Sequence, residues 1–514
     1  MLLKHSLMTT YQPVTWKLFF FPKSVHLSGD VVLLRAFDRQ RTDGDTVGLP
    51  PARVGRPFFL DEDGNSHIAL NGFFSSGRMR NRSEGTNRKY AHSLGVWVNF
   101  LARRDAHWDS ATEEDLLDYK YWRRTDDRNP RPVSGSTWSG DVVAIGTFYD
   151  WSRKTHNGPD LLATAAIRAT RGWHTDRGTR GVMLKGSTIR GADVKWLSPA
   201  AFRKWRDVGI HGIAPNGSER VLWRPRCQTR DSAFVDGLYG SGLRLQEWAS
   251  VLTTELAEPA PNRDYVTHRL ADACAKGAHG HPFWLKRTVL DSIADYAETE
   301  RAAAVRRAQA SGMYERLLDV RVVDQPTLNG RVQITDADGT SRRSVDLGEL
   351  NPNQRLSLFF RSDTGLEPLM LWLNEDGSPR PKRAWYKAFS SANARVRRSG
   401  IDRMECRPHM LRHSFALRWY AVGRLIWQQR NVGLETDHAL DFRQQFGDAW
   451  SLVQTMLGHT SVETTKNIYL EPFLTLDVQL VMEYGLSELD SELLLQVLRS
   501  NPQVRLAEYP AEAS

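Results

Sequence analysis

The sequence predicts a mainly α-helical protein with a small β-sheet, built as an all-α module followed by a longer α+β segment. From Thr86 to about Lys154, apolar residues recur at helical spacing, which predicts the all-α module. From about residue 196 to 485 the helical pattern is interrupted by two runs rich in β-branched residues. These runs, Val320–Val323 and Val332–Ile334, flank an Asn-Gly pair and predict short strands.

The composition is that of a folded protein with more than one domain. The chain has 514 residues, of which 25% are charged and 40% hydrophobic. A chain of this length exceeds what one compact core usually holds, so two or three domains are expected. The boundaries we predict are an amino-terminal extension of unclear role at 1–80, a helical domain at 81–160, a linker at 161–195, an α+β domain at 196–485 and a tail at 486–514.

Cysteine content and hydropathy exclude several classes of protein. The three cysteines, Cys227, Cys274 and Cys406, are far apart, which argues against a disulfide framework or a cysteine-based zinc site. No apolar run has the length of a membrane span. The short run Leu18–Phe21 lacks the small-residue cleavage site of a signal peptide. We therefore expect a cytoplasmic protein without a membrane segment.

The charge is positive and unevenly distributed. The formal net charge is +9. After Tyr469 the chain has eight acidic and two basic residues, so this segment carries −6 and the remainder +15. An excess of positive charge favours an acidic partner such as nucleic acid, although charge alone does not identify it.

Three helices are expected in the first module. The first presents an apolar face that includes Leu94 and Trp97, and the second begins near Thr112 with Asp115 as its capping-box partner. The third covers about Trp138–Arg153. Residues 475–500, near the carboxyl end, are also predicted to be helical.

The first candidate site follows a glycine-containing turn. Gly242 precedes Arg244, which the pattern places in the first turn of a helix with Glu247 three residues later. A guanidinium at a helix start presents several donors to an anion. The alternative is an ordinary ion pair between Arg244 and Glu247.

The second candidate site is the run from Arg407 to His413. Pro408 fits the first position of a helix, and His409 and Arg412 would share a face that looks outward. His409 and His413 have the spacing of two zinc-binding histidines, but Met410 stands where a metalloprotease helix has glutamate. We therefore expect no metal here.

The third candidate site extends from Gly458 to Tyr469. Gly458 is expected to end one helix, and Thr460 with Glu463 would cap the next. Tyr469 falls near the end of that second helix. Taken alone, such a tyrosine is usually a half-buried packing residue.

Taken in order, these motifs resemble those of the tyrosine recombinases, the phage integrase family. The motifs are GLRxxE at 242–247, HxLRH at 409–413, LGH at 457–459, and paired threonines followed by Tyr469. The resemblance implies an α+β catalytic domain at 196–485 and an all-α core-binding domain at 81–160. It also implies a site-specific recombinase that breaks and rejoins DNA without a cofactor.

The resemblance assigns a role to each site residue. Tyr469 would be the nucleophile and His409 its proton acceptor. Arg244 and Arg412 would clamp the phosphate, and His459 would donate a hydrogen bond to it. Glu247 would support the first arginine or His409.

The family also has a catalytic lysine in a β-hairpin turn. Lys276, followed by Gly277 and by the run Pro282–Leu285, is the best match. Lys286 is the alternative, and either could instead be a solvated lysine. His279 and His281 flank the same turn and are expected at the surface.

Two spacings depart from the family pattern. Tyr469 lies ten positions after His459, where a spacing of nine is usual, and one extra residue rotates a helix by about 100°. The distance from His409 to His459 is also long, through an apparent insertion within about 424–448.

The implied partners are double-stranded DNA and further copies of the chain, as a tetramer on paired DNA sites. The tail after Tyr469 would dock on a neighbouring protomer. A type IB topoisomerase and a non-catalytic DNA-binding relative stay open as alternatives. The sequence does not separate an integrase of a mobile element from a transposon recombinase or a resolvase, and residues 1–80 could be a DNA-binding arm or a brace.

Overall fold

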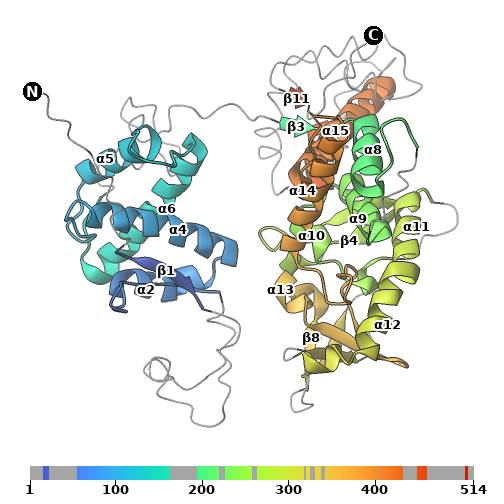
Figure 1. Cartoon of the computed structure of the whole chain (residues 1–514), viewed down its shortest axis with the longest axis horizontal. Coiled ribbons are helices and arrows are strands. Elements are labelled where there is room, and N and C mark those ends of the chain that lie inside the picture. Colours follow the sequence, from blue (N-terminus) through green and yellow to red (C-terminus); the bar gives the residue numbers. More distant parts are fainter. Residues whose placement is uncertain are drawn as a thin grey trace, which may run out of the picture. The chain divides into compact units, whose positions relative to one another are not determined.

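The chain divides into two compact units, residues 1–190 and 191–514 (Figure 1). The computed structural model describes these parts of the chain: 15–21, 55–161, 194–218, 226–257, 263–317, 320–324, 330–336, 342–402, 404–431, 449–459 and 504–506. Among the described helices, none has the length and hydropathy that crossing a membrane requires.

The first unit is a helical module with one small hairpin. Its helices are α2 (Ile68–Ser75), α3 (Gly77–Arg80), α4 (Glu84–Ala102), α5 (Glu113–Arg124) and α6 (Gly135–His156). The strands β1 (Lys17–Phe20) and β2 (Pro57–Leu60) pair antiparallel beside them. The three helices predicted between Thr86 and Lys154 are confirmed as α4, α5 and α6, and the hairpin strands lie before them in the chain.

Side-chain caps begin the helices where the sequence indicates. Thr112 accepts a hydrogen bond from the amide of Asp115, and the Asp115 carboxylate accepts one from the amide of Thr112, which completes the predicted capping box. The Ser83 side chain caps α4 by accepting a hydrogen bond from the Thr86 amide. Ser134 caps α6, so this helix begins three residues before Trp138.

Phe59, Leu70 and Phe73 are buried in the same core as Leu94 and Trp97. The core of the first unit therefore begins within the segment 1–80.

A buried carboxylate joins the three long helices of this unit. Asp141 on α6 accepts from the Ser93 hydroxyl on α4 at 2.6 Å and from Nε of Arg123 on α5 at 3.1 Å. Asp141 is 2% exposed, and a carboxylate this deep needs such partners to offset its lost hydration.

The second unit is α+β, as predicted. Its described α-helices are α8 (Pro199–Arg206), α9 (Gln228–Ser241), α10 (Leu245–Ala249), α11 (Arg287–Tyr296), α12 (Ala302–Ala310), α13 (Pro352–Arg355), α14 (Lys382–Arg398), α15 (Pro408–Asn431) and α17 (Ala449–Leu457). The buried helix α9 contacts α10, α11 and α15. Because α9 leads directly into the turn before Arg244, this packing fixes the first candidate site.

The largest sheet of the described residues has five strands in the order β10-β9-β6-β7-β8. Its members are β6 (Arg321–Asp324), β7 (Arg331–Asp336), β8 (Arg342–Asp346), β9 (Leu358–Ser362) and β10 (Gly365–Pro368). The two predicted strands are β6 and β7, which pair antiparallel. Strands β6 and β9 pair parallel, while the other neighbours are antiparallel.

A second hairpin and a long-range strand pair complete the unit. Strands β4 (Tyr265–Arg269) and β5 (Pro282–Lys286) pair antiparallel. Strand β3 (Val194–Trp196) pairs parallel with β11 (Val504–Leu506), from the far end of the chain. The predicted linker and tail thus each contribute residues to one small sheet. The predicted helix at 475–500 lies outside the described residues.

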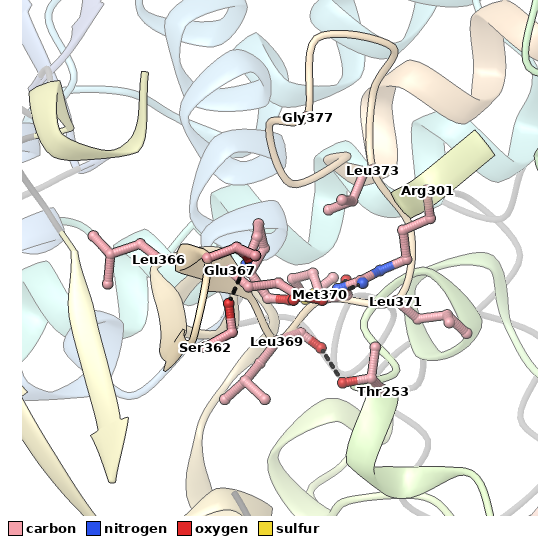
Figure 2. A network of polar contacts seen from close by, with 12 residues as sticks. Thr253, Arg301, Ser362, Leu366, Glu367, Leu369, Met370, Leu371, Leu373 and Gly377 are labelled. Atoms are coloured by element: carbon pink, nitrogen blue, oxygen red, sulfur yellow. Dashed lines mark hydrogen bonds and ion pairs between the residues drawn. The ribbon is translucent and has the colours of Figure 1, made fainter. Parts of the chain in front are cut away.

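A buried arginine connects the five-stranded sheet to the helices. Nη1 of Arg301 donates to the Glu367 carboxylate at 2.6 Å, and Nη2 donates to the carbonyls of Pro368 (2.6 Å) and Met370 (3.3 Å). Figure 2 shows Arg301 lying along this segment, with Thr253 opposite Leu369. The Thr253 hydroxyl donates to the Leu369 carbonyl at 3.3 Å, which ties the chain that follows α10 to the same segment (Figure 2).

Candidate functional site

Arg244 lies immediately before a short helix. Helix α9 ends at Ser241, Gly242 takes a left-handed conformation with φ +67°, and Arg244 is the N-cap of α10. The expectation that Arg244 lies in the first helical turn is therefore wrong by one position, since α10 begins at Leu245. A Cβ on Gly242 would fall 2.4 Å from the Phe415 ring, so the turn depends on glycine for both space and conformation.

Glu247 is the carboxylate around which the first part of the site is arranged. It is 1% exposed, and its oxygens accept from the Arg244 amide at 2.7 Å and from Arg244 Nη1 at 2.8 Å. Burial alone would raise the pKa of Glu247, but Arg244 and Arg412 outweigh it and hold the pKa below its usual value. The ion pair that the sequence offered as an alternative is thus present, and Glu247 is charged.

The backbone of Lys276 contacts the Glu247 carboxylate. The turn between β4 and β5 carries Lys276, and the Lys276 amide donates to Glu247 Oε1 at 3.3 Å. Gly277 follows with φ +86°, which permits the turn. Lys286 is the last residue of β5, at the opposite end of this strand from the turn, where it pairs with Tyr265 and precedes α11.

His409 and Arg412 both lie in the first turns of α15, which begins at Pro408 as predicted. Solvent reaches His409, but Arg412 is 2% exposed, so the expectation that both look outward is wrong for Arg412. The surrounding protein, together with the charges of Arg412, Arg244 and Lys276, lowers the pKa of His409 below 6.5. This shift favours a neutral imidazole that can accept a proton.

The buried side chain of Arg412 connects the turn at Gly242 with the end of α17 at Leu457. Its Nη1 donates to the Gly242 carbonyl at 2.6 Å, and its Nη2 donates to the Leu457 carbonyl at 2.8 Å. Nη2 also lies 3.0 Å from Nε2 of His459. Since arginine only donates, His459 Nε2 accepts here and Nδ1 carries the proton.

His459 follows the end of α17, where Gly458 has φ +62° as its predicted role as a helix terminator requires. The His459 amide donates to the Gln454 carbonyl, and the Gln454 amide group donates to the His459 carbonyl, both at 3.0 Å. Burial has the largest effect on the pKa of His459, and together with the positive charges of Arg412 and Arg244 it lowers this pKa to about 3. The ring is therefore neutral at physiological pH.

Sequence reasoning missed His281, which was expected at the surface. His281 is 8% exposed, and the charges of Glu247, Arg412 and Arg244 all act on its pKa. His279, by contrast, is exposed as expected. The signal that could have found His281 is its position directly before β5, where one strand residue in two faces inward.

Two segments beside the site, 432–448 and 460–503, lie outside the described part of the chain. The second contains Tyr469 and the capping pair Thr460 and Glu463, and the first contains most of the predicted insertion at about 424–448. Residues up to Asn431 continue α15. The roles of Tyr469 and of its ten-residue spacing from His459 therefore stay predictions.

Within the described residues, no cluster of three or more histidine, cysteine or acidic side chains has the arrangement of a metal site. Cys227, Cys274 and Cys406 are free thiols. What the described residues do bring together is Arg244, Glu247, Lys276, Arg412 and His459, with His409 in the same electrostatic environment.

One family model matches part of the first unit. Residues 77–156 match the family model of the phage integrase N-terminal SAM-like domain, which spans α3 to α6. No curated protein sequence matches the chain.

Solved structures of recombinases align with most of the chain at low identity. The XerH site-specific recombinase bound to its palindromic difH substrate, in a post-cleavage complex, aligns at 14% identity and a TM-score of 0.41, covering 81% of this chain and 84% of that chain. The Tn1549 transposon integrase in complex with circular intermediate DNA aligns at 12% identity and a TM-score of 0.39, covering 78% and 94%.

The family model thus identifies one domain of the chain. Residues 77–156 are similar to the phage integrase N-terminal SAM-like domain, and an α+β unit that contains Arg244, Glu247, His409, Arg412 and His459 follows this domain along the chain.

Proposed function

We propose that this protein cleaves and rejoins DNA at specific sites through a 3′-phosphotyrosine intermediate on Tyr469, and that it integrates or excises a mobile element. One observation carries the proposal. Four segments far apart in sequence bring two arginines, a lysine and two histidines to one place, supported by the buried carboxylate of Glu247. Such a set suits a phosphodiester, whose negative oxygens repel a nucleophile until cations neutralise them.

Arg244 and Arg412 supply the neutralising charge. Each guanidinium has a fixed fork of N–H donors that matches the two non-bridging oxygens of a phosphate. The bond from Arg244 to Glu247 fixes the first fork. The Gly242 and Leu457 carbonyls fix the second.

The proposed cleavage step exchanges one phosphorus–oxygen bond for another. The Tyr469 oxygen attacks phosphorus, its proton passes to His409, and a new phosphorus–oxygen bond forms. The bond between phosphorus and the 5′ oxygen breaks, and Lys276 gives that oxygen a proton to form a free 5′-hydroxyl. Rejoining is the reverse step with a 5′-hydroxyl from a partner strand, so the energy of the broken bond is kept and no ATP is needed.

His459 would complete the phosphate pocket. Because its Nε2 accepts from Arg412, its proton is on Nδ1, and this N–H is the group that would donate to a phosphate oxygen. The family resemblance implies double-stranded DNA as substrate and four protomers on two sites as the active assembly.

A suicide-substrate assay tests the proposal. Nicked duplexes from a pool that contains the junctions of the encoding element are mixed with the full chain, and covalent complexes are resolved on a denaturing gel. The expected result is a protein–DNA band for the wild type that is absent for Tyr469→Phe. No band across the pool, despite tight binding to it, would favour a non-catalytic DNA-binding protein.

A second assay separates a recombinase from a topoisomerase. The protein is incubated with a supercoiled plasmid that lacks the junctions and with one that carries two of them. Exchange between the two junctions, with no relaxation of the control plasmid, is expected of a recombinase. Relaxation of the control plasmid would favour a type IB topoisomerase.

A further inference from the structure

His281 has a fixed tautomer inside the protein. The residue lies between the Lys276 turn and β5, and its Nδ1 is 2.9 Å from the Pro282 carbonyl. Because a carbonyl oxygen only accepts, Nδ1 carries the proton, and Nε2 of the neutral ring has a lone pair. This Nε2 is buried and has no hydrogen-bond partner among the described residues.

The ring of His281 lies directly against Gly458. A Cβ on Gly458 would fall 1.9 Å from Cδ2 and 2.2 Å from Nε2 of His281, which no real side chain tolerates. Gly458 is thus required twice, for its φ of +62° and for the close approach of this ring.

Gly458 also lies between Leu457 and His459, and Nη2 of Arg412 bonds to both of these residues. Nη2 of Arg412 bonds the carbonyl of Leu457 on one side of Gly458 and the ring of His459 on the other. The contact between the His281 ring and Gly458 therefore lies where the chain leaves α17, directly before the His459 ring that Arg412 contacts.

The electrostatic environment supports a neutral ring at this position. Burial lowers the pKa of His281 below 6.5, and Arg412 and Arg244 act in the same direction, against the opposing effects of the hydrogen bond to the Pro282 carbonyl and of Glu247. An uncharged ring can pack among cations without adding repulsion.

We propose that His281 is a positioning residue of the strand-cleavage site, which holds His459 against Arg412 by packing its ring on Gly458. The inference rests on the proposed function for its role in cleavage. The packing itself can be tested without DNA.

The first test compares three full-length variants. His281→Ala removes the ring, His281→Asn keeps a donor for the Pro282 carbonyl and an atom facing Gly458, and His279→Ala is the exposed control from the same turn. The rate of covalent-complex formation is measured at saturating DNA, together with the Kd for DNA. His281→Ala should slow cleavage about 10- to 100-fold, since small misplacements of reacting groups have effects of this size, with little change in Kd.

The two other variants define the role further. His281→Asn should recover part of the lost rate, and His279→Ala should match the wild type. A wild-type rate for His281→Ala, or an equal loss in His279→Ala, would overturn the proposal.

A double-mutant cycle distinguishes positioning from general loosening of the fold. If His281 acts through His459, the variant with both His281→Ala and His459→Ala should cleave at the rate of His459→Ala alone. Rates that fall by the product of the two single losses would show that the residues act independently, against the proposal.

A spectroscopic measurement keeps the inference separate from the proposed function. The ¹⁵N signals of the His459 ring are recorded without DNA in wild type and in His281→Ala, with His459→Ala to assign them. The proposal requires these signals to shift when the His281 ring is removed, and unchanged signals would refute it even if the protein cleaved no DNA.

Discussion

Arg412 and His459 form a hydrogen bond of 3.0 Å in which the guanidinium donates and the imidazole Nε2 accepts. The same Arg412 side chain donates to the carbonyls of Gly242 and Leu457, so one buried residue holds the turn before Arg244 and the turn before His459. This arrangement makes Arg412 a structural and an electrostatic centre of the site.

The first prediction concerns the shape of this guanidinium. Arg412→Lys keeps the positive charge, but one ammonium group cannot span both carbonyls and His459. We expect covalent-complex formation to fall about 100-fold or more. The free energy of unfolding should fall by about 1–3 kcal/mol for each buried carbonyl left unpaired, measured by denaturation. The control is Arg407→Lys, an exposed arginine beside the same helix, which should change neither quantity.

The second prediction decides between the two lysines. Lys276→Ala should slow cleavage of ordinary DNA about 100-fold or more, because the departing 5′ oxygen loses its proton donor. A substrate with sulfur in place of that oxygen releases a thiolate, whose conjugate acid has a pKa of about 8.5, and should restore the rate.

The matched control for this experiment is Lys286→Ala. Since Lys286 ends β5 and precedes α11, its variant should cleave both substrates at wild-type rates. The reverse pattern, with sulfur rescue in Lys286→Ala only, would assign the proton donor to Lys286.

The third prediction concerns acid stability of the first unit. His67 caps α2 by accepting from the Leu70 amide, and burial, with a smaller effect of His107, lowers its pKa to about 4. The unfolded chain, with a histidine pKa of about 6.5, therefore takes up a proton that the folded state resists. The contribution of neutral His67 to the free energy of unfolding is therefore complete above pH 6.5 and is lost as the pH falls towards 4.

This contribution can be isolated with a substitution that keeps the cap. Asparagine caps helices without titrating, so His67→Asn should lose less stability than the wild type between pH 7 and pH 4. The difference should be on the order of 3 kcal/mol in chemical denaturation of the full chain. Parallel pH profiles for the two proteins would contradict the assignment.

The fourth prediction concerns the connection between sheet and helices shown in Figure 2. Arg301→Met would leave the Glu367 carboxylate and two buried carbonyls without their donor. The free energy of unfolding should fall by about 3–5 kcal/mol, as when one partner of a buried ion pair is removed. Arg307→Met removes an exposed bond to the Glu375 carbonyl and should have an effect below about 1 kcal/mol. Equal losses in the two variants would contradict this account of Arg301.

Local signals in the sequence were sufficient for much of the fold. The capping box of Thr112 and Asp115, the proline that opens α15 and the glycine that ends α17 were each predicted from neighbouring residues and are present. In each of these features the interacting residues lie within one or two helical turns of each other, so a short stretch of sequence is enough to predict them.

Features that depend on distant parts of the chain could not be predicted in this way. The pairing of β3 with β11 joins residues more than 300 positions apart, and three of the five strands in the large sheet carried no recognised signal. Strand pairing depends on which partner is available in space, and a short segment does not contain that information.

The sequence by itself determined which chemical groups this protein has and in what order they occur along the chain. The tertiary structure decided which of them are buried and what they touch. It placed Arg412 inside the protein, bonded to Gly242, Leu457 and His459, and it turned His281 inward against Gly458. Burial and contact are set by packing between segments far apart in sequence, and this packing also gives an ordinary histidine or arginine its pKa, its tautomer and its role.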